Sequence, residues 1–471
     1  MLPIALSPLT ERTLMAQKTS RPNILFIMDD QHRFDYLGSA GAGFVRTPNL
    51  DRLAERGVRF TQCTTNCAVC APSRIALATG LQPSRLGCVD NSCFLPRSVP
   101  TYYQRLRDHG YRVGCIGKLD LAKPDGYNGR YGDRPCVYGW GFTHPEECEG
   151  KMHAGSSPTP IGPYTHYLQE RGLLQAFYED YRNRSAKGWI NGASHDSVLP
   201  TDAFEDTYIG RRAAEWIESI PDDFPWHLFV SFVGPHDPFD PPSEYGDRYR
   251  NAEMPGAVQD SMTGKAAWVG KRVIDIEPEE VAVTRRQYCG AIELIDDGVG
   301  LILNALKRRG MLENTYIIFS SDHGEMLGDH GLYTKSVAYE PSLRVPLIVA
   351  GPGIEGGRVS DALVELIDIN PTICELADVP PLENIDALSF SPILRSEAIG
   401  HRTETVSAIR NFRCIRTETH KLIQNYNDIV ELYNLENDPE ELHNIADAQS
   451  KLTRNLSQRL TQRFREGKWL R

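Results

Sequence analysis

The sequence predicts an α/β fold, in which helices sandwich a large, mostly parallel sheet and a small antiparallel sheet with one helix follows. Short apolar runs recur between residues 23 and 350, each bounded by polar or turn residues, as expected for buried strands. Helical patterns separate these runs, and strands that alternate with helices favour parallel pairing with helices on both faces. From about residue 400 the pattern changes to short strands in close succession.

The elements follow in chain order. The strands predicted for the large sheet are Asn23–Met28, Val113–Ile116, His227–Val233, Tyr316–Ser320 and Val345–Ala350. The clearest helical patterns are Asn49–Arg56, Pro100–His109 and Gln287–Arg309. Residues 121–200 are rich in Gly, Pro, Tyr and His and show little periodicity, so we expect long loops there. Ligands of parallel sheets bind at the carboxyl ends of the strands, so polar clusters directly after these runs are the candidate site.

The chain divides into three predicted parts. Residues 1–20 form a tail that lacks the basic start and long apolar core of a secretory signal. Residues 21–399 form the large α/β domain. Residues 400–471 form a small subdomain, with the predicted strands Glu404–Ile409, Phe412–Glu418, Lys421–Gln424 and Glu431–Asn434 and the helix Gln449–Glu466.

Composition excludes several classes of protein. A formal charge of −11 provides no basic field for nucleic acid, although locally placed cations can still bind an anion. No run approaches the ~20 apolar residues of a membrane span. The eleven cysteines are scattered without a tight framework, so we expect mostly reduced thiols and a cytoplasmic protein.

Two acidic groups follow predicted strands. Asp29 and Asp30 end the first run, while Asp322 and His323 come directly after Tyr316–Ser320. Parallel strands bring these ends to one edge of the sheet, where clustered carboxylates repel one another unless a cation is bound. Three carboxylates and one imidazole suit Ca²⁺, Mg²⁺ or Mn²⁺ better than structural zinc. A solvated turn is the alternative interpretation for Asp29 and Asp30 taken alone.

Cys70 begins a predicted helix, Ala71–Thr79, with a proline in its first turn. The group at position 70 therefore lies near a helix N-terminus, which favours an anion, and Arg74 follows one turn later. Two alternatives stay open at this point. Cys63, Cys67 and Cys70 have the C-x3-C-x2-C spacing of a radical-SAM iron–sulfur cluster, and Cys70 could also be a plain buried thiol.

Three basic side chains share this placement. Lys118 follows the run Val113–Ile116, His236 follows His227–Val233, and Lys335 lies shortly after Asp322. Each alone is typical of a solvated or structural residue. Together at one edge of a sheet they would suit a tetrahedral oxyanion such as sulfate or phosphate.

Ordered stretches over most of the chain resemble type I sulfatases, the formylglycine-dependent branch of the alkaline phosphatase superfamily. The segment from Cys70 to Asn91 is most similar to choline sulfatases and phosphonate monoester hydrolases. The supporting stretches are R-P-N-I-L-F-I-M-D-D (21–30), T-P-N-L-D-R-L-A (47–54), C-A-P-S-R (70–74), G-Y-R-V-G-C-I-G-K (110–118), P-H-D-P (235–238), S-D-H-G-E-M-L-G-D-H-G (321–331), R-V-P-L-I-V (344–349) and E-L-Y-N-L-E-N-D-P-E-E (431–441).

The resemblance implies an alkaline-phosphatase-like fold and a set of roles. Cys70 would be oxidised to formylglycine by a formylglycine-generating enzyme, and its hydrate would attack the sulfur of a sulfate ester. The group at 70 and four side chains would bind one divalent cation, usually calcium. Arg74 would orient the hydrate, three residues would contact the sulfate, and Asn91 would contact the transferred group. The implied metal ligands are Asp29, Asp30, Cys70, Asp322 and His323, and the implied sulfate contacts are Lys118, His236 and Lys335.

This chain departs from the family pattern at two of these positions. Many sulfatases have asparagine where this chain has His323, and a histidine ligand leaves room for manganese. The lysine motif of the family usually continues to a histidine at the position of Asp120. We expect Asp120 to be a catalytic residue. An aspartate could act as a base, as the histidine does in the family, but it would add negative charge beside an anion.

The resemblance implies a sulfatase that acts on a small-molecule or oligosaccharide sulfate ester. A phosphonate monoester or phosphodiester hydrolase on the same scaffold is the alternative. Lys118 favours the sulfatase, because the phosphonate hydrolases lack that lysine, whereas His323 slightly favours the alternative. A binding protein without activity is disfavoured, since every core position except that of Asp120 holds a competent residue.

Overall fold

Eight strands form the large sheet, in the order β4-β3-β5-β1-β6-β7-β2-β8. The computed structural model describes residues 21–186 and 194–464, so the predicted tail of residues 1–20 lies outside the described residues. All strands run parallel except β7, which is antiparallel to both of its neighbours. The strands are β1 Asn23–Asp29, β2 Gly57–Thr64, β3 Arg112–Lys118, β4 His144–Cys148, β5 Trp226–Ser231, β6 Thr315–Ser321, β7 Leu347–Ala350 and β8 Arg358–Glu365.

β7 is the antiparallel strand of a sheet that is otherwise parallel, in agreement with the mostly parallel sheet that the sequence predicts. A parallel connection needs a crossover of about a dozen or more residues, usually a helix, that returns the chain to the opposite edge. Between β6 and β7 the described helix α13, Glu340–Leu343, has only four residues. The chain therefore stays at the carboxyl edge of β6 and enters β7 from that edge, which reverses the strand.

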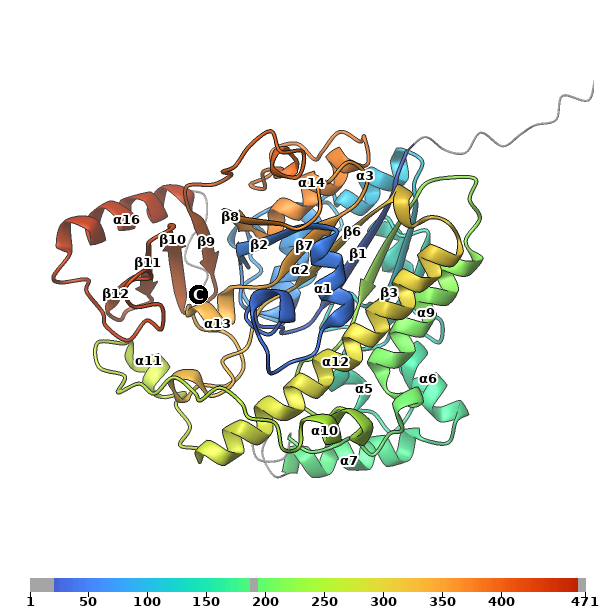
Figure 1. The fold of residues 1–471 in the computed structure, drawn as a ribbon, viewed down its shortest axis with the longest axis horizontal. Coiled ribbons are helices and arrows are strands. Elements are labelled where there is room, and N and C mark those ends of the chain that lie inside the picture. The colour runs from blue at the N-terminus through green and yellow to red at the C-terminus, as the bar shows by residue number, and fades with distance from the viewer. Residues whose placement is uncertain (1–20, 187–193, 465–471) are drawn as a thin grey trace, which may run out of the picture.

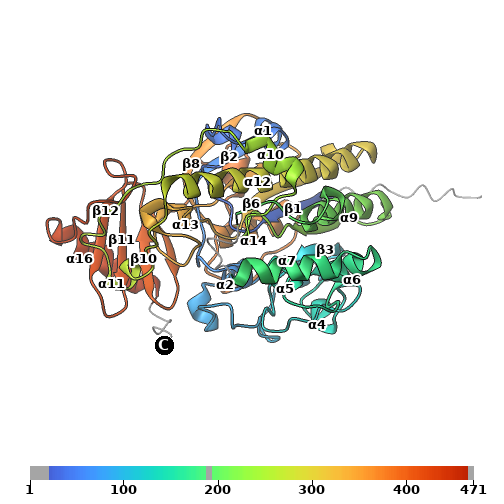
Figure 2. The ribbon, with the colours of Figure 1, turned by 90° about the horizontal axis from the view of Figure 1, so that it is seen from below.

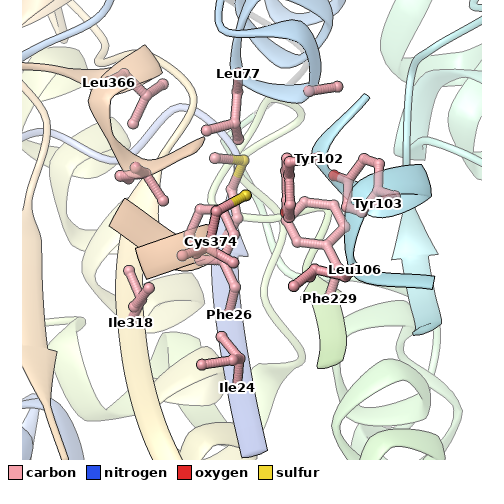
Figure 3. Close-up of a cluster of buried hydrophobic side chains, with 14 of the residues drawn as sticks. Ile24, Phe26, Leu77, Tyr102, Tyr103, Leu106, Phe229, Ile318, Leu366 and Cys374 are labelled. Carbon is pink, nitrogen blue, oxygen red and sulfur yellow. The ribbon is translucent and has the colours of Figure 1, made fainter. Parts of the chain in front are cut away.

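Helices cover both faces of the large sheet (Figure 1). Leu25 and Ile27 of β1 pack with helices α1, α9 and α12 on one face. Ile24 and Phe26 point the other way, toward α2, α3 and α14, as Figure 3 shows for Leu77, Tyr102 and Leu106. The helices are α1 Pro48–Glu55, α2 Cys70–Thr79, α3 Tyr102–Asp108, α4 Pro135–Gly139, α5 Lys151–Ala154, α6 Pro163–Glu170, α7 Leu174–Ala186, α9 Glu205–Ser219, α10 Ser243–Tyr249, α11 Ala267–Gly270, α12 Pro278–Arg308, α13 Glu340–Leu343, α14 Ile369–Leu376, α15 Ser391–Leu394 and α16 Ser450–Arg463.

The segment 121–200 is more regular than the sequence suggests. It contains the edge strand β4 and the helices α4 to α7, where we expected long loops. The buried side chains of α6, such as Tyr164 and Leu168, are four residues apart and lie on one helix face. The helix has only eight residues, so this pattern repeats too briefly to stand out among the surrounding Gly and Pro.

A second, antiparallel sheet of four strands lies at one end of the molecule (Figure 2). Helix α16 packs on it through Leu456 and Leu460. The opposite face of the sheet shares an apolar cluster with Cys67–Val69, directly before α2, and with Leu332 and Tyr339 around α13. The strands are β9 Thr405–Ala408, β10 Phe412–Arg416, β11 His420–Asn425 and β12 Val430–Asn434.

The small sheet therefore supports two segments that lead into the candidate site.

Among the described residues, no helix combines the length and the apolar composition that crossing a bilayer requires.

Candidate active site

The candidate site lies where four neighbouring parallel strands end. Strands β3, β5, β1 and β6 are adjacent in the sheet and run in the same direction. Lys118 is the last residue of β3, Asp30 follows β1, and Asp322 follows β6. His236 lies five residues beyond the end of β5. The parallel register therefore brings these four side chains to one edge of the sheet, as the sequence predicts.

Cys70 is the first residue of α2, and its side chain is fully buried. The preceding residue, Val69, has an extended backbone that turns the chain into the helix. Cys70 Sγ lies 3.1 Å from His323 Nε2 and 3.8 Å from Asp30 Oδ1. The start of α2 thus presents the Cys70 side chain directly to the acidic group.

Four side chains can hold a metal ion. The ligand atoms of Asp30, Cys70, Asp322 and His323 all lie within 4.8 Å of one another, and all four residues are buried. His323 Nδ1 lies 3.0 Å from the Gly324 carbonyl oxygen, so Nδ1 carries the proton and the lone pair of Nε2 faces the group. Two carboxylates, an imidazole and a sulfur make a donor set that fits a divalent cation.

Asp29 is the one predicted metal ligand that the structure does not bring into this group. Successive side chains of a strand point to opposite faces, so Asp29 and Asp30 diverge. Asp29 Oδ2 is 2.5 Å from His32 Nδ1, on the side of the strand where His32 meets Tyr288 and Phe319 edge-on. Asp29 Oδ1 is buried without a hydrogen-bond partner in the part of the chain that the structure describes.

Arg74 links the helix to both acidic strand ends. Its Nε donates to Asp322 Oδ2 over 2.7 Å, and its Nη2 lies 3.5 Å from Asp30 Oδ2. Its Nη1 donates to the Lys118 carbonyl oxygen over 2.8 Å and to Ser231 Oγ over 2.7 Å. Arg74 therefore fixes the ends of β1, β3, β5 and β6 relative to one another.

Lys118 lies between two carboxylates. Its Nζ contacts Asp30 Oδ2 directly and lies 3.1 Å from Asp120 Oδ2. Gly150 makes room for this side chain, since a Cβ at that position would lie 3.2 Å from Lys118 Cε. Burial opposes charge on the Asp30 carboxyl, but Lys118, together with His236 and Arg74, holds its pKa well below the ordinary value.

His236 and Lys335 contact each other at the site. Lys335 Nζ lies 2.7 Å from His236 Nε2, and His236 Nδ1 lies 2.6 Å from the Asp237 carbonyl oxygen. The carbonyl accepts the proton of Nδ1, which leaves Nε2 to accept from Lys335. Gln31 Oε1 also accepts from Lys335 Nζ. Both predicted anion contacts are thus held in place by neighbouring polar groups.

Asn91 lies beside the start of α2. Its Oδ1 accepts a hydrogen bond from the Ala71 backbone N–H over 3.1 Å. Because Ala71 N–H is one of the first donors of the helix, Asn91 caps the end of α2 that carries Cys70. The structure therefore places Asn91 within one residue of the group it is predicted to assist.

The charges around Cys70 favour an anion. Burial and the Asp30 carboxylate would raise the pKa of the Cys70 thiol. The cations Lys118, Lys123 and Lys335 outweigh them and hold this pKa well below its ordinary value. An anionic group at position 70, or bound beside it, is therefore electrostatically matched to its surroundings.

Sequence reasoning missed four residues of the site. Gln31 bridges Lys335 to Glu325 and Asp237, and it directly follows the predicted acidic pair. Ser231 ends β5, so the rule of strand ends could have found it. No sequence pattern points to Lys123, which lies in the loop after β3 and not at the end of a strand. None points to Lys151 either, although its Nζ donates to the carbonyl oxygens of His236 and Pro238 and so holds the His236 loop.

Nine of the described cysteines, Cys70 among them, have free thiols, in line with the expectation of mostly reduced cysteines. The structure adds one disulfide that the sequence does not predict, between Cys88 and Cys93. It closes the loop that carries Asn91.

Comparison with known proteins places the chain in a family. The sulfatase family model matches residues 22–379, and a model described as N-sulphoglucosamine sulphohydrolase, C-terminal, matches residues 328–467. A choline-sulfatase of Rhizobium meliloti is 30% identical over 451 residues, which cover 91% of this chain and 83% of that protein. An N-acetylglucosamine-6-O-sulfatase of Bacteroides thetaiotaomicron is 28% identical over 478 residues, with the same coverage of each chain.

Solved structures agree with this placement. The phosphonate monoester hydrolase of Agrobacterium radiobacter superimposes with a TM-score of 0.81 at 25% identity, covering 95% of this chain and 96% of that one. Its fold is the one predicted for this chain, with a large, mainly parallel sheet and a small antiparallel sheet. The chain belongs to the sulfatase family of sulfuric ester hydrolases, within the alkaline phosphatase superfamily.

Proposed function

We propose that the protein hydrolyses the sulfate ester of a small alcohol or a sulfated carbohydrate, with a formylglycine made from Cys70 as the nucleophile. The position of Cys70 carries this proposal. It begins α2, it is fully buried, and it faces the group of Asp30, Asp322 and His323. A cysteine in that position, among cations that would hold a tetrahedral anion, fits sulfate transfer better than a structural thiol.

Asp30, Asp322, His323 and the group at position 70 would hold one divalent cation. Calcium is our first choice because two buried carboxylates supply hard oxygen ligands; the same carboxylates leave magnesium as an alternative, and the imidazole of His323 leaves manganese as another. When bound, the ion stabilises negative charge on the transferring group. The place of Asp29 in this ligand set stays a prediction.

The side chains around this group would bind and orient the ester. Lys118 and Lys335 would hold sulfate oxygens, with Asn91 at the start of α2. Arg74 would keep Asp322 and Asp30 in place through its hydrogen bonds. Lys335 Nζ, which donates to His236 Nε2 over 2.7 Å, would supply the proton that the leaving alkoxide needs, either directly or through His236.

The named relatives support the proposed range of substrates. One acts on choline sulfate by name, another is an N-acetylglucosamine-6-O-sulfatase, and a third is an ulvan-active sulfatase. The cytoplasmic location predicted from the sequence remains part of the proposal, and it favours a small imported ester over an intact polysaccharide.

The mass of the peptide that contains residue 70 tests the nucleophile. The protein would be produced together with a formylglycine-generating enzyme and digested, and the peptide mass compared with that of protein made without that enzyme. We expect an aldehyde or its hydrate at position 70. An unmodified thiol under these conditions would contradict the proposal. Cys70→Ala should remain folded but lose hydrolysis.

A panel of three esters separates the proposed activity from its alternative. Turnover of an aryl sulfate would be compared with that of an aryl phosphonate and a bis-aryl phosphate. The structural likeness to a phosphonate monoester hydrolase makes this comparison necessary, while the resemblance to the family favours the sulfate, because the phosphonate hydrolases lack a lysine at the position of Lys118. We expect the highest kcat/KM for the aryl sulfate. Preference for either phosphorus ester would support the alternative.

A further inference from the structure

The loop after β3 brings a carboxylate and a second lysine to the candidate site. Asp120 Oδ2 lies 3.1 Å from Lys118 Nζ and 2.6 Å from Lys123 Nζ. Two backbone hydrogen bonds hold the loop, from Leu95 N–H to the Leu121 carbonyl and from Asp125 N–H to the Ala122 carbonyl. The Asp120 Oδ2 atom thus contacts both ammonium groups. The distance between Lys118 Nζ and Lys123 Nζ therefore cannot exceed the sum of their distances to this oxygen.

Asp120 stays ionised in this arrangement. Burial opposes charge on the Asp120 carboxyl, but Lys118 and Lys123 hold its pKa below the usual range. A carboxylate that keeps its charge is a poor proton acceptor at neutral pH. It would also repel the anion for which Lys118, His236 and Lys335 are placed. Pairing with the two lysines is therefore a better explanation for a carboxylate at position 120 than a role as a general base.

The Lys123 ammonium group has N–H donors that no described residue accepts. An ammonium group has three N–H donors, and within the described residues Asp120 is the only hydrogen-bond partner of Lys123 Nζ. The side chain is 19% exposed and lines one pocket together with Lys118 and His236. Each ammonium reaches an oxygen about 2.7–3.0 Å away, so two ammoniums at this separation can hold neighbouring oxygens of one tetrahedral anion.

We propose that Lys123 is a further contact for the transferring sulfate group and that Asp120 is a positioning residue that holds Lys123 beside Lys118. Asp120 stands at the position where the lysine motif of the family usually has a histidine. The Asp120 carboxylate orients the long, flexible lysine side chain, and Lys123 supplies the cation. This inference rests on the proposed function, because it assigns both residues to the same anion site.

Binding of inorganic sulfate to the matured, metal-loaded protein tests the inference. Isothermal titration at low ionic strength would compare the parent with Lys123→Ala, Lys123→Arg and Asp120→Ala. Lys307→Ala is the matched control, because Lys307 is an exposed lysine on α12. Loss of one charged hydrogen bond should weaken sulfate binding about 10- to 100-fold in Lys123→Ala. Lys123→Arg should restore most of it, and Lys307→Ala should match the parent.

Asp120→Ala separates positioning from simple repulsion. If Asp120 positions Lys123, its removal weakens sulfate binding, and the loss is smaller in the Lys123→Ala background. If Asp120 only repels the anion, its removal tightens binding and overturns this part of the inference. Thermal unfolding of each variant checks that the fold is intact.

The remaining outcomes distinguish this inference from the proposed function. Unchanged affinity in Lys123→Ala, or a parent that binds no sulfate, would overturn the assignment of Lys123. Hydrolysis of an aryl sulfate by the parent would still uphold the proposed function in that case. Conversely, weaker sulfate binding by Lys123→Ala in a protein that hydrolyses no sulfate ester would support the anion contact and contradict the proposed function.

Discussion

Arg74 Nε donates a hydrogen bond to Asp322 Oδ2 over 2.7 Å, so the side chain one turn after Cys70 neutralises a carboxylate that comes from β6. The same guanidinium reaches Asp30, Ser231 and the Lys118 backbone. No point charge can replace these contacts, because they use three different nitrogens of one planar group. Arg74 therefore connects helix α2 to the ends of four strands.

Arg74→Lys should lower kcat/KM for the preferred ester by about 100- to 1,000-fold, the cost typical of removing one preorganised donor. The variant should also melt at a lower temperature, because buried partners such as Ser231 Oγ lose their donor. Steady-state kinetics and thermal unfolding measure the two effects. Arg56→Lys is the matched control at an exposed ion pair. Equal activity in both variants would contradict the assigned role.

Asp30→Asn should lose the metal, whereas Asp29→Asn should keep it. Asp30 lies in the group of four ligands, while Asp29 Oδ2 is paired with His32. Loss of a direct ligand should weaken metal affinity by at least the roughly 10- to 100-fold that removal of an outer partner costs. Metal content after dialysis, measured by mass spectrometry, gives the answer. Loss of metal from both variants would indicate that Asp29 is also a metal ligand and would contradict the prediction.

Glu340→Gln should weaken the packing of α13 against the small sheet and so destabilise the protein. The Glu340 carboxylate, buried in α13, accepts hydrogen bonds from Arg416 and Lys421 of the small sheet, each over 3.0 Å. Breaking a buried ion pair from one side typically costs about 3–5 kcal/mol, and here Arg416 would stay buried without its carboxylate partner while Lys421 keeps Glu441, 2.6 Å away. Urea unfolding measures the free energy of unfolding. Glu313→Gln, at an exposed pair, should change it little, and similar effects in both would contradict this account.

His227 should make the protein less stable in acid. Complete burial lowers the pKa of this histidine from 6.5 to about 3. Between these values the unfolded chain binds a proton that the folded protein does not, so stability is full above pH 6.5 and falls as the pH decreases toward 3. Between pH 7 and pH 5 this amounts to about 2 kcal/mol.

His227→Gln should remove that part of the pH dependence, whatever its effect on stability at pH 7. Urea unfolding at pH 7 and pH 5 tests this, with the half-buried His109→Gln as the control. Groups such as Asp206, whose pKa is raised to about 6, act in the opposite direction in all three proteins, so the comparison between variants cancels them. The same pH slope in His227→Gln and the parent would contradict the prediction.

Most of the fold can be predicted from the sequence, because continuous apolar runs indicate buried parallel strands. The rule of strand ends also predicts where Lys118, Asp30, His236 and Asp322 lie, since it depends only on direction and pairing. The direction of β7 could not be predicted, because it depends on where the chain travels between two strands. The division at residue 399 stays a prediction, and an apolar cluster joins the small sheet to the segments before α2 and around α13.

Finer details of the site depend on geometry that a pattern does not contain. Asp29 and Asp30 are chemically identical neighbours, and only the pleat of β1 decides which one faces Cys70. Lys123 is an unremarkable lysine in a loop until the chain folds it against Asp120. Gln31 acts through its contacts with Lys335 and Glu325, which are distant in the sequence.

The burial of Cys70 limits when the residue can be modified. His323, which contacts its sulfur, lies 253 residues later in the chain. A ribosome that adds roughly 5–20 residues per second needs roughly 10–50 s to synthesise that stretch. An enzyme that oxidises Cys70 must therefore act during this interval or on an unfolded chain. Under the proposed mechanism, protein that folds before it meets such an enzyme would keep its thiol and stay inactive, even with every other residue of the site in place.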